Sequence, residues 1–80
     1  EWAKDGIRVN ALTPGSVATD AILPKDPAKR EAFITEMASQ NLFKRLADPR
    51  EIARAARFLA SDAASYMTGS VMTVDAGFLA

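Results

Sequence analysis

The chain has 80 residues, with ten acidic and ten basic side chains, no cysteine and no histidine. Without cysteine there is no disulfide framework, and without histidine the commonest metal ligand and general base are both missing, so we expect no metal site. Balanced charges leave no basic surface for nucleic acid, and no apolar run approaches the roughly 20 residues that span a membrane. These features favour a globular protein of a reducing compartment, the cytoplasm.

The first residues are typical of the end of a helix. The sequence begins with Glu1 rather than methionine, and Lys4 and Gly6 suit the last helical turn and the stop position. We therefore expect a further segment upstream of Glu1.

The alternation of side chains over Ile7–Leu12 predicts a short β-strand. Pro14-Gly15 ends this run, and residues 13–47 are expected to hold a loop followed by a helix. Asp26-Pro27 indicates where that helix begins, with aspartate at the N-cap and proline at the first helical position. We expect this helix to run to about Gln40.

Residues 48–62 carry the clearest helical pattern. Asp48 suits the N-cap, Pro49 the first turn, and Glu51 the third position of a capping box. Small and apolar residues then recur at helical spacing, so this helix can pack flat on a sheet or on a twin helix.

Residues 70–75 alternate again and predict a second strand. Strand, helices, strand is the order of a right-handed parallel crossover, which places the chain in the α/β class. Two strands are too few for a stable sheet, and both would keep unpaired edges. Partner strands must therefore come from elsewhere, or copies of the chain must assemble.

Several motifs, in one order, carry a family resemblance. They are IRVN followed by Pro14-Gly15, then Val17 and Thr19, residues 58–62 (FLASD), and residues 66–69 (YMTG) leading to Val74-Asp75. In this order the chain resembles the C-terminal part of the classical short-chain dehydrogenase/reductase family, over essentially its whole length. The resemblance implies a doubly wound Rossmann domain that transfers hydride between NAD or NADP and an alcohol or carbonyl substrate.

The resemblance also implies a role for each segment. Residues 7–12 and 70–75 resemble the sixth and seventh strands of the family. Ser16 to about Gln40 resembles the mobile substrate-binding loop, and Asp48–Ala60 resembles a helix at the subunit interface of many tetramers. By this resemblance residues 1–80 are the C-terminal segment of a single Rossmann-type domain, whose partners are the missing N-terminal portion and further copies.

The resemblance places the family's catalytic groups upstream of Glu1. The family's glycine-rich phosphate turn does not occur in these residues. The Tyr-x-x-x-Lys pair is also missing, because the one tyrosine, Tyr66, is followed four residues later by Ser70 and not by lysine. We therefore predict no catalytic residue in this chain. The residues that distinguish NAD from NADP usually follow the second strand and also lie upstream. The chain departs from the family at Asp75-Ala76-Gly77, usually Asp-Gly-Gly, and at Leu42–Ala47, often a Gly-Arg turn.

The candidates for cofactor binding are Pro14, Gly15, Val17 and Thr19. Proline fixes φ, and glycine lets the backbone approach a ligand with no Cβ in the way. The resemblance implies that the Val17 backbone, together with the Thr19 backbone and hydroxyl, binds the nicotinamide carboxamide. The alternatives are an ordinary strand-to-loop turn at Pro14-Gly15 and a local turn capped by Thr19-Asp20.

Two further sets of residues are candidates for contacts. A partly apolar substrate pocket under the mobile loop is predicted from Ile22, Leu23, Phe33 and Met37, although Phe33 and Met37 are equally explained as helix core. The predicted subunit interface comprises Ile52, Ala56, Leu59, Ala60, Met72 and Val74. Asn10 is expected to satisfy neighbouring backbone groups, and Asp75 to serve a turn or the interface.

Two classes of function remain open. The first is the C-terminal portion of an NAD(P)-dependent oxidoreductase that supplies the nicotinamide-side turn, the substrate lid and an oligomer interface. The second is a free-standing, non-catalytic module that associates with copies of itself through the helix at 49–60 and the strand at 70–75.

Overall fold

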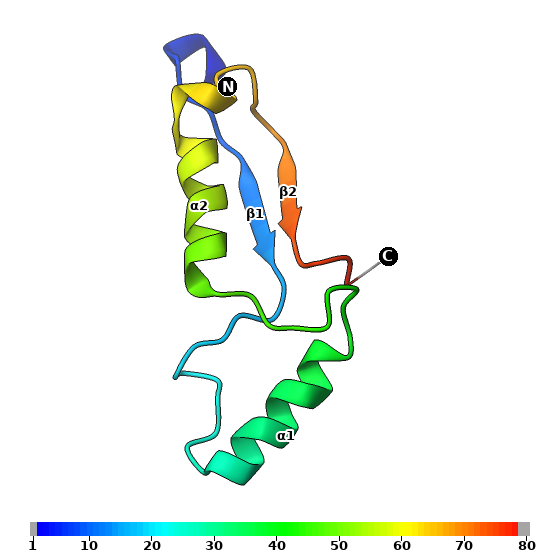
Figure 1. Cartoon of the computed structure of the whole chain (residues 1–80). Helices are drawn as coiled ribbons and strands as arrows, with labels where there is room; N and C mark the ends of the chain where they lie inside the picture. The colour runs from blue at the N-terminus through cyan, green and yellow to red at the C-terminus, as the bar shows by residue number, and fades with distance from the viewer. Residues whose placement is uncertain (1, 79–80) are drawn as a thin grey trace.

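The computed structural model describes residues 2–78, which form an α/β unit around two parallel strands (Figure 1). In chain order the elements are η1 (Ala3–Asp5), β1 (Ala11–Pro14), α1 (Pro27–Ala38), α2 (Pro49–Ala60), η2 (Asp62–Ala64) and β2 (Val71–Val74). The strands pair in parallel, with Ala11 opposite Val71 and Pro14 opposite Val74. The predicted α/β class with two parallel strands is confirmed.

The first strand lies later in the chain than the predicted Ile7–Leu12. Residues 7–10, predicted as strand, lie outside it, because side chains make many of the bonds to the neighbouring segment there. Val9 N–H donates to Thr68 Oγ1 (3.2 Å), while Asn10 Nδ2 donates to Met67 O (3.1 Å) and Asn10 Oδ1 accepts from Ser70 N–H (3.0 Å). The backbone ladder is regular only from Ala11, so the strand extends through Pro14. The expected structural role of Asn10 is confirmed.

Aspartate caps begin both helices, as predicted. Asp26 accepts a hydrogen bond from Lys29 N–H, and α1 ends at Ala38, two residues before the expected Gln40. Asp48 and Glu51 form the complete capping box at the start of α2. Gly6 lies at the predicted stop position, where it closes the short 3₁₀ helix η1 in the left-handed conformation (φ 77°).

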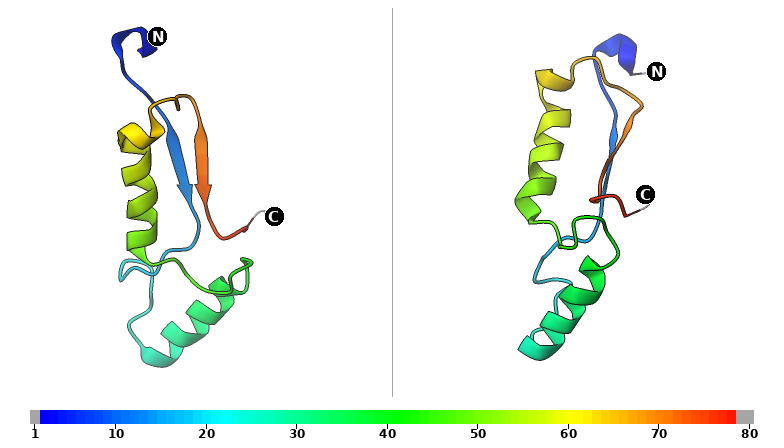
Figure 2. Two further views of the ribbon diagram at one scale, coloured as in Figure 1. Left: turned by 45° about the horizontal axis from the view of Figure 1, so that its top comes forward. Right: turned by 45° about the vertical axis from the view of Figure 1, so that its right-hand side comes forward.

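One face of the sheet is covered and the other is open. α2 lies along β1, where the Arg8 guanidinium donates to the carbonyls of Leu59 (2.8 Å), Ser61 (3.2 Å) and Met67 (3.2 Å). Figure 2 shows α2 on one side of the two strands, and no element within residues 2–78 covers the other side. Val71, on β2, is 65% exposed.

The molecule is elongated, with principal extents of 53 × 25 × 20 Å. Only four apolar residues are buried among those described: Leu23, Ala38, Leu46 and Ala64. Two of them, Ala38 and Leu46, lie at the end of α1 and in the connection between α1 and α2, which passes the carboxyl ends of the strands (Figure 1). In open α/β folds, ligands bind at this end of the sheet. In the part of the chain that the structure describes, no helix has the length and apolarity to cross a membrane.

Candidate functional site

The turn after β1 passes directly against the end of β2. Gly15 N–H donates to Val74 O at 3.0 Å. A Cβ at Gly15 would lie 2.9 Å from the Cα and 3.0 Å from the Cβ of Asp75, which is closer than real side chains approach. The space that glycine leaves at position 15 is therefore filled by the chain's own second strand. Asp75 in turn accepts a hydrogen bond from Gly77 N–H (3.0 Å), which confirms the turn role among the two expected for it.

Residues 16–18 form a second, isolated parallel bridge with the segment that precedes α2. Ala47 N–H donates to Ser16 O, and Ala18 N–H donates to Ala47 O, both at 2.9 Å. In a parallel bridge the central residue, here Val17, turns its own N–H and C=O to the opposite side. Neither group of Val17 has a hydrogen-bond partner within residues 2–78.

Thr19 closes a turn with its backbone and leaves its hydroxyl available. Its carbonyl accepts from Ile22 N–H (3.2 Å) and Leu23 N–H (3.1 Å). The hydroxyl has no hydrogen-bond partner among the described residues. Asp20 reaches Arg30 instead (3.9 Å). The local turn that the sequence offered as an alternative therefore exists, but it uses the Thr19 carbonyl and not the hydroxyl.

A cavity of about 80 Å³ opens at the carboxyl ends of both strands. Its walls come from Gly15 and Ser16 after β1, from Val74 and Asp75 at the end of β2, and from the connection between α1 and α2. Of the four predicted cofactor residues, only Gly15 lines this cavity. Val17 is bonded through its neighbours to Ala47, which is also in the wall.

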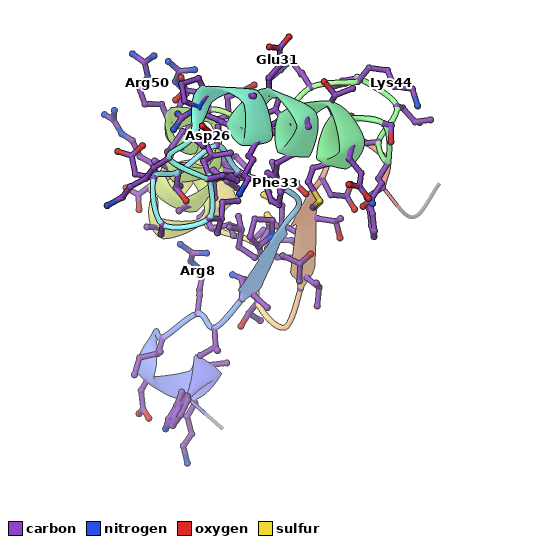
Figure 3. All side chains as sticks on the ribbon, turned by 90° about the horizontal axis from the view of Figure 1, so that it is seen from below. Arg8, Asp26, Glu31, Phe33, Lys44 and Arg50 are labelled. Atoms are coloured by element: carbon purple, nitrogen blue, oxygen red, sulfur yellow. The ribbon has the colours of Figure 1, made fainter. Side chains whose placement is uncertain are left out.

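Asn41 and Arg45, in the same wall, are residues that sequence analysis missed. The Asn41 side chain is buried, where Nδ2 donates to Arg45 O (2.9 Å) and Oδ1 accepts from Lys44 N–H (2.8 Å). Lys44 has φ 57°, and Figure 3 shows its side chain at the edge of the molecule. An asparagine just after a helix, in a loop with no glycine, was the available signal, because its amide can satisfy a tight turn.

Arg45 forms a two-point ion pair with Glu51. Arg45 Nη1 and Nη2 donate to Glu51 Oε1 and Oε2 at 2.7 and 2.9 Å, and Asp48 N–H also donates to Oε1 (2.9 Å). The hydrogen bonds from Arg45 and from the Asp48 backbone lower the Glu51 pKa from 4.5 to about 2. The capping role of Glu51 was predicted. Its pairing with Arg45, six residues earlier and outside the helix, does not follow a helical spacing.

The predicted substrate residues are not gathered in this cavity. Leu23 is buried in the local core, whereas Ile22 is about half exposed and Phe33 and Met37 are partly buried. None of the four lines the cavity at the strand ends. Viewed along the strands, Figure 3 shows Phe33 on the side of α1 that faces the sheet and Glu31 on the opposite side.

The predicted interface residues lie on α2 and β2, and part of the set faces the chain's own sheet. Ala56, Leu59 and Ala60 line a groove together with Arg8, Asn10 and Leu12 from the β1 side. The small residues of this helix were expected to let it pack either on a sheet or on a twin helix, and this face of α2 packs on the sheet. Ile52, Met72 and Val74 are partly buried.

Acidic side chains and the single tyrosine are also placed by the structure. No group of three acidic side chains is placed to hold a metal ion within that range. The Tyr66 side chain is fully exposed, at the opposite end of the strands from the cavity. The groups of chemical interest are thus backbone N–H and C=O groups, the Thr19 hydroxyl and the Arg45–Glu51 pair.

Comparison with known proteins identifies the family. Residues 1–79 match the profile of a family described as enoyl-(acyl carrier protein) reductase. A short chain dehydrogenase/reductase of Aspergillus oryzae is 49% identical over 77 residues, which are 96% of this chain and 30% of that protein. Galactitol 2-dehydrogenase (L-tagatose-forming) of Cereibacter sphaeroides is 50% identical over 98% of this chain and 30% of its own length.

Solved structures agree. A short chain dehydrogenase family protein from Francisella tularensis superposes with a TM-score of 0.86 at 32% identity, over 98% of this chain and 35% of that one. A 4-hydroxyisoleucine dehydrogenase complexed with NADH gives a TM-score of 0.81 at 27% identity, over 96% and 31%. The chain thus spans about a third of the length of these relatives. It belongs to the short-chain dehydrogenase/reductase family.

Proposed function

We propose that these 80 residues are the C-terminal portion of an NAD(P)-dependent oxidoreductase, in which Pro14, Gly15, Val17 and Thr19 form the nicotinamide side of the cofactor site. Relatives of this chain are dehydrogenases, and one structural neighbour was solved with NADH. The chain covers about 30% of its curated relatives, so the remainder of the site would come from the rest of such a protein.

The observation that carries the proposal is the orientation of Val17. The bridge to Ala47 turns the Val17 N–H and C=O away from the chain's own backbone, and the Thr19 hydroxyl has no partner among residues 2–78. A nicotinamide carboxamide offers one acceptor and two donor hydrogens, which these three groups match. The bound cofactor would supply hydride transfer, and these residues would fix the face of its ring.

The catalytic acid and base would lie outside this chain. Tyr66 is fully exposed and has Ser70 four residues later, so it lacks the lysine of the family's Tyr-x-x-x-Lys pair. We propose that the upstream portion of the same fold supplies that pair and the assisting serine. It would also supply the strand that pairs with the free edge of the two-stranded sheet.

The segment from Ser16 to Gln40 is proposed as the lid over an alcohol or carbonyl substrate. Ile22, Phe33 and Met37 retain exposed surface and can contact a substrate, whereas Leu23 would act by holding the segment together. The interface of a homo-oligomer is proposed to involve the predicted residues of α2 and β2, which are Ile52, Ala56, Leu59, Ala60, Met72 and Val74. A chain without cysteine suits the reducing cytoplasm, where we place the protein.

The proposal is tested in the complete protein by titration with NADH and NADPH and by assay of hydride transfer. Thr19→Val removes the free hydroxyl and keeps the side-chain shape, so we expect roughly tenfold weaker cofactor binding or slower turnover. Thr35→Val is the matched control, because the Thr35 hydroxyl only bonds the Glu31 carbonyl within α1 (3.0 Å). A complete protein that binds neither cofactor would overturn the proposal.

The open sheet face favours one alternative, a non-catalytic module that associates with copies of itself. Sedimentation of the 80-residue chain, combined with NADH titration, separates the two functions. A defined oligomer that binds no cofactor, even with the upstream portion supplied in trans, would favour the module. Restored turnover would favour the oxidoreductase.

A further inference from the structure

Ala47, which bonds to both neighbours of Val17, lies in a short segment, residues 45–48, that is held at both ends. On one side, Arg45 donates through Nη1 to Leu46 O (3.3 Å), and the Leu46 side chain is buried. On the other side, Asp48 N–H donates to Glu51 Oε1 (2.9 Å) and Asp48 O accepts from Glu51 N–H (2.8 Å). Ala47 lies between these two anchors.

The Arg45–Glu51 pair joins the two anchors. Its bonds of 2.7 and 2.9 Å hold the start of the segment to the first turn of α2. Asn41 adds a third restraint, since its buried amide donates to Arg45 O (2.9 Å). We name these three side chains, Asn41, Arg45 and Glu51, the clamp.

Within residues 2–78, the hydrogen bonds that join the clamp segment to the neighbours of Val17 are made by the backbone of Ala47. Ala47 bonds on both sides of Val17, to Ser16 O and to Ala18 N–H, each at 2.9 Å. A rotation of the peptide groups of Ala47 would release these bonds and with them the orientation of Val17. A shift of about 1 Å in such a positioning contact can reduce turnover by up to about a hundredfold.

We propose that Asn41, Arg45 and Glu51 are positioning residues, which fix Ala47 and thereby aim the Val17 N–H and C=O at the nicotinamide. This role rests on the proposed function. Bidentate arginine–carboxylate pairs restrict geometry as well as adding energy. The Arg45 and Glu51 side chains are 53% and 35% exposed, and ion pairs this exposed add little to stability. The pair therefore acts on orientation more than on folding.

The test uses the complete protein with Glu51→Gln and Arg45→Met. Glutamine keeps an oxygen that can accept from Asp48 N–H, so Glu51→Gln breaks the ion pair and spares the cap. Arg50→Met is the matched control, because it removes the other two-point pair at this helix start, Arg50 with Asp48 at 3.1 and 3.0 Å. The control pair makes no hydrogen bond to residues 45–47.

Two readouts separate positioning from folding. The first is the Kd for NADH or NADPH, measured beside the Kd for ADP-ribose or its 2′-phosphate, which lack the nicotinamide. We expect the clamp variants to weaken cofactor binding or to lower kcat on the order of tenfold, with the ADP-ribose Kd unchanged and the thermal midpoint lowered no more than in Arg50→Met. The second is amide hydrogen exchange, in which Ala18 and Ala47 should exchange faster in the clamp variants only.

Three results decide the matter. Clamp variants that behave like Arg50→Met in both readouts would overturn the proposal. An equal loss of cofactor and ADP-ribose binding would also overturn it, because it would indicate a general structural role. If the wild-type protein bound no nicotinamide cofactor, the proposed function would fail. Amide exchange would then still decide whether the clamp holds Ala47.

Discussion

At Gly15 the chain leaves β1 and crosses the end of β2, with its amide bonded to Val74 O. The sequence indicated a glycine that admits a ligand, and the structure shows that the absent Cβ makes room for Asp75. One turn later, Ala76 has φ 51°, in the left-handed region where the resemblance expects glycine. Position 15 therefore has no room for a Cβ. Position 76 has a left-handed backbone that favours glycine, yet this chain has alanine there.

Gly15→Ala is expected to destabilise the complete protein by about 1–3 kcal/mol, because a Cβ at 2.9 Å from backbone must displace the end of β2. Ala76→Gly is the control of opposite sign, and it should leave stability unchanged or raise it by up to about 1 kcal/mol, since it relieves the left-handed strain. Urea denaturation measures both. A Gly15→Ala protein as stable as the wild type would contradict the close approach.

Among the elements, α2 has the most strongly specified start. Asp48 and Glu51 each cap the helix and each form an ion pair. Asp48 pairs with Arg50, and Glu51 pairs with Arg45. Hydrogen bonds from the Arg50 side chain and backbone lower the Asp48 pKa from 3.8 to about 2, as Arg45 does for Glu51. Both carboxylates therefore cap the helix, and that of Glu51 also holds Arg45, two residues before Ala47.

This arrangement predicts acid sensitivity. Because the folded pKa values lie below the unfolded ones, the stabilisation is complete above about pH 4.5 and is lost as the pH falls toward about 2. The unfolding free energy, measured against pH at low ionic strength, should fall across this window. Glu51→Gln should reduce the slope, and added salt should lower the contribution of both exposed pairs at neutral pH. An unchanged slope in Glu51→Gln would show that this carboxylate does not contribute.

The whole molecule is less compact, and exposes more surface, than a compact domain of the same length. Its radius of gyration is 15.9 Å, against about 12 Å for a compact domain of 80 residues. Its accessible surface is 6086 Å², against about 4,700 Å² for a compact monomer of 8.6 kDa. Exposed apolar residues lie both on the bare sheet, at Val71, and outside it, at Leu42, Phe43 and Tyr66 among others, so this portion of the fold leaves apolar surface that further structure can cover.

We expect the isolated 80-residue chain to unfold without a sharp transition or to self-associate, because its open sheet face exposes Val71 and its strand edges are unpaired. Val71→Lys, on that face, should reduce self-association in sedimentation experiments. Ala32→Lys, on the exposed side of α1, is the control and should not. A compact, cooperatively folding monomer with wild-type sequence would contradict this expectation.

Local interactions let the sequence by itself determine the two helix starts, the α/β class, the family resemblance and the turn at Pro14-Gly15. Caps, turn residues and alternation all act within a few positions of the chain, so a single sequence carries them. The tertiary structure alone decided where the first strand begins, because strand limits depend on the partner backbone at residues 67–74. It also decided the direction of Val17 and the clamp behind it. Those depend on Ala47, thirty residues away, and contacts at that separation are fixed by the packing of the whole chain.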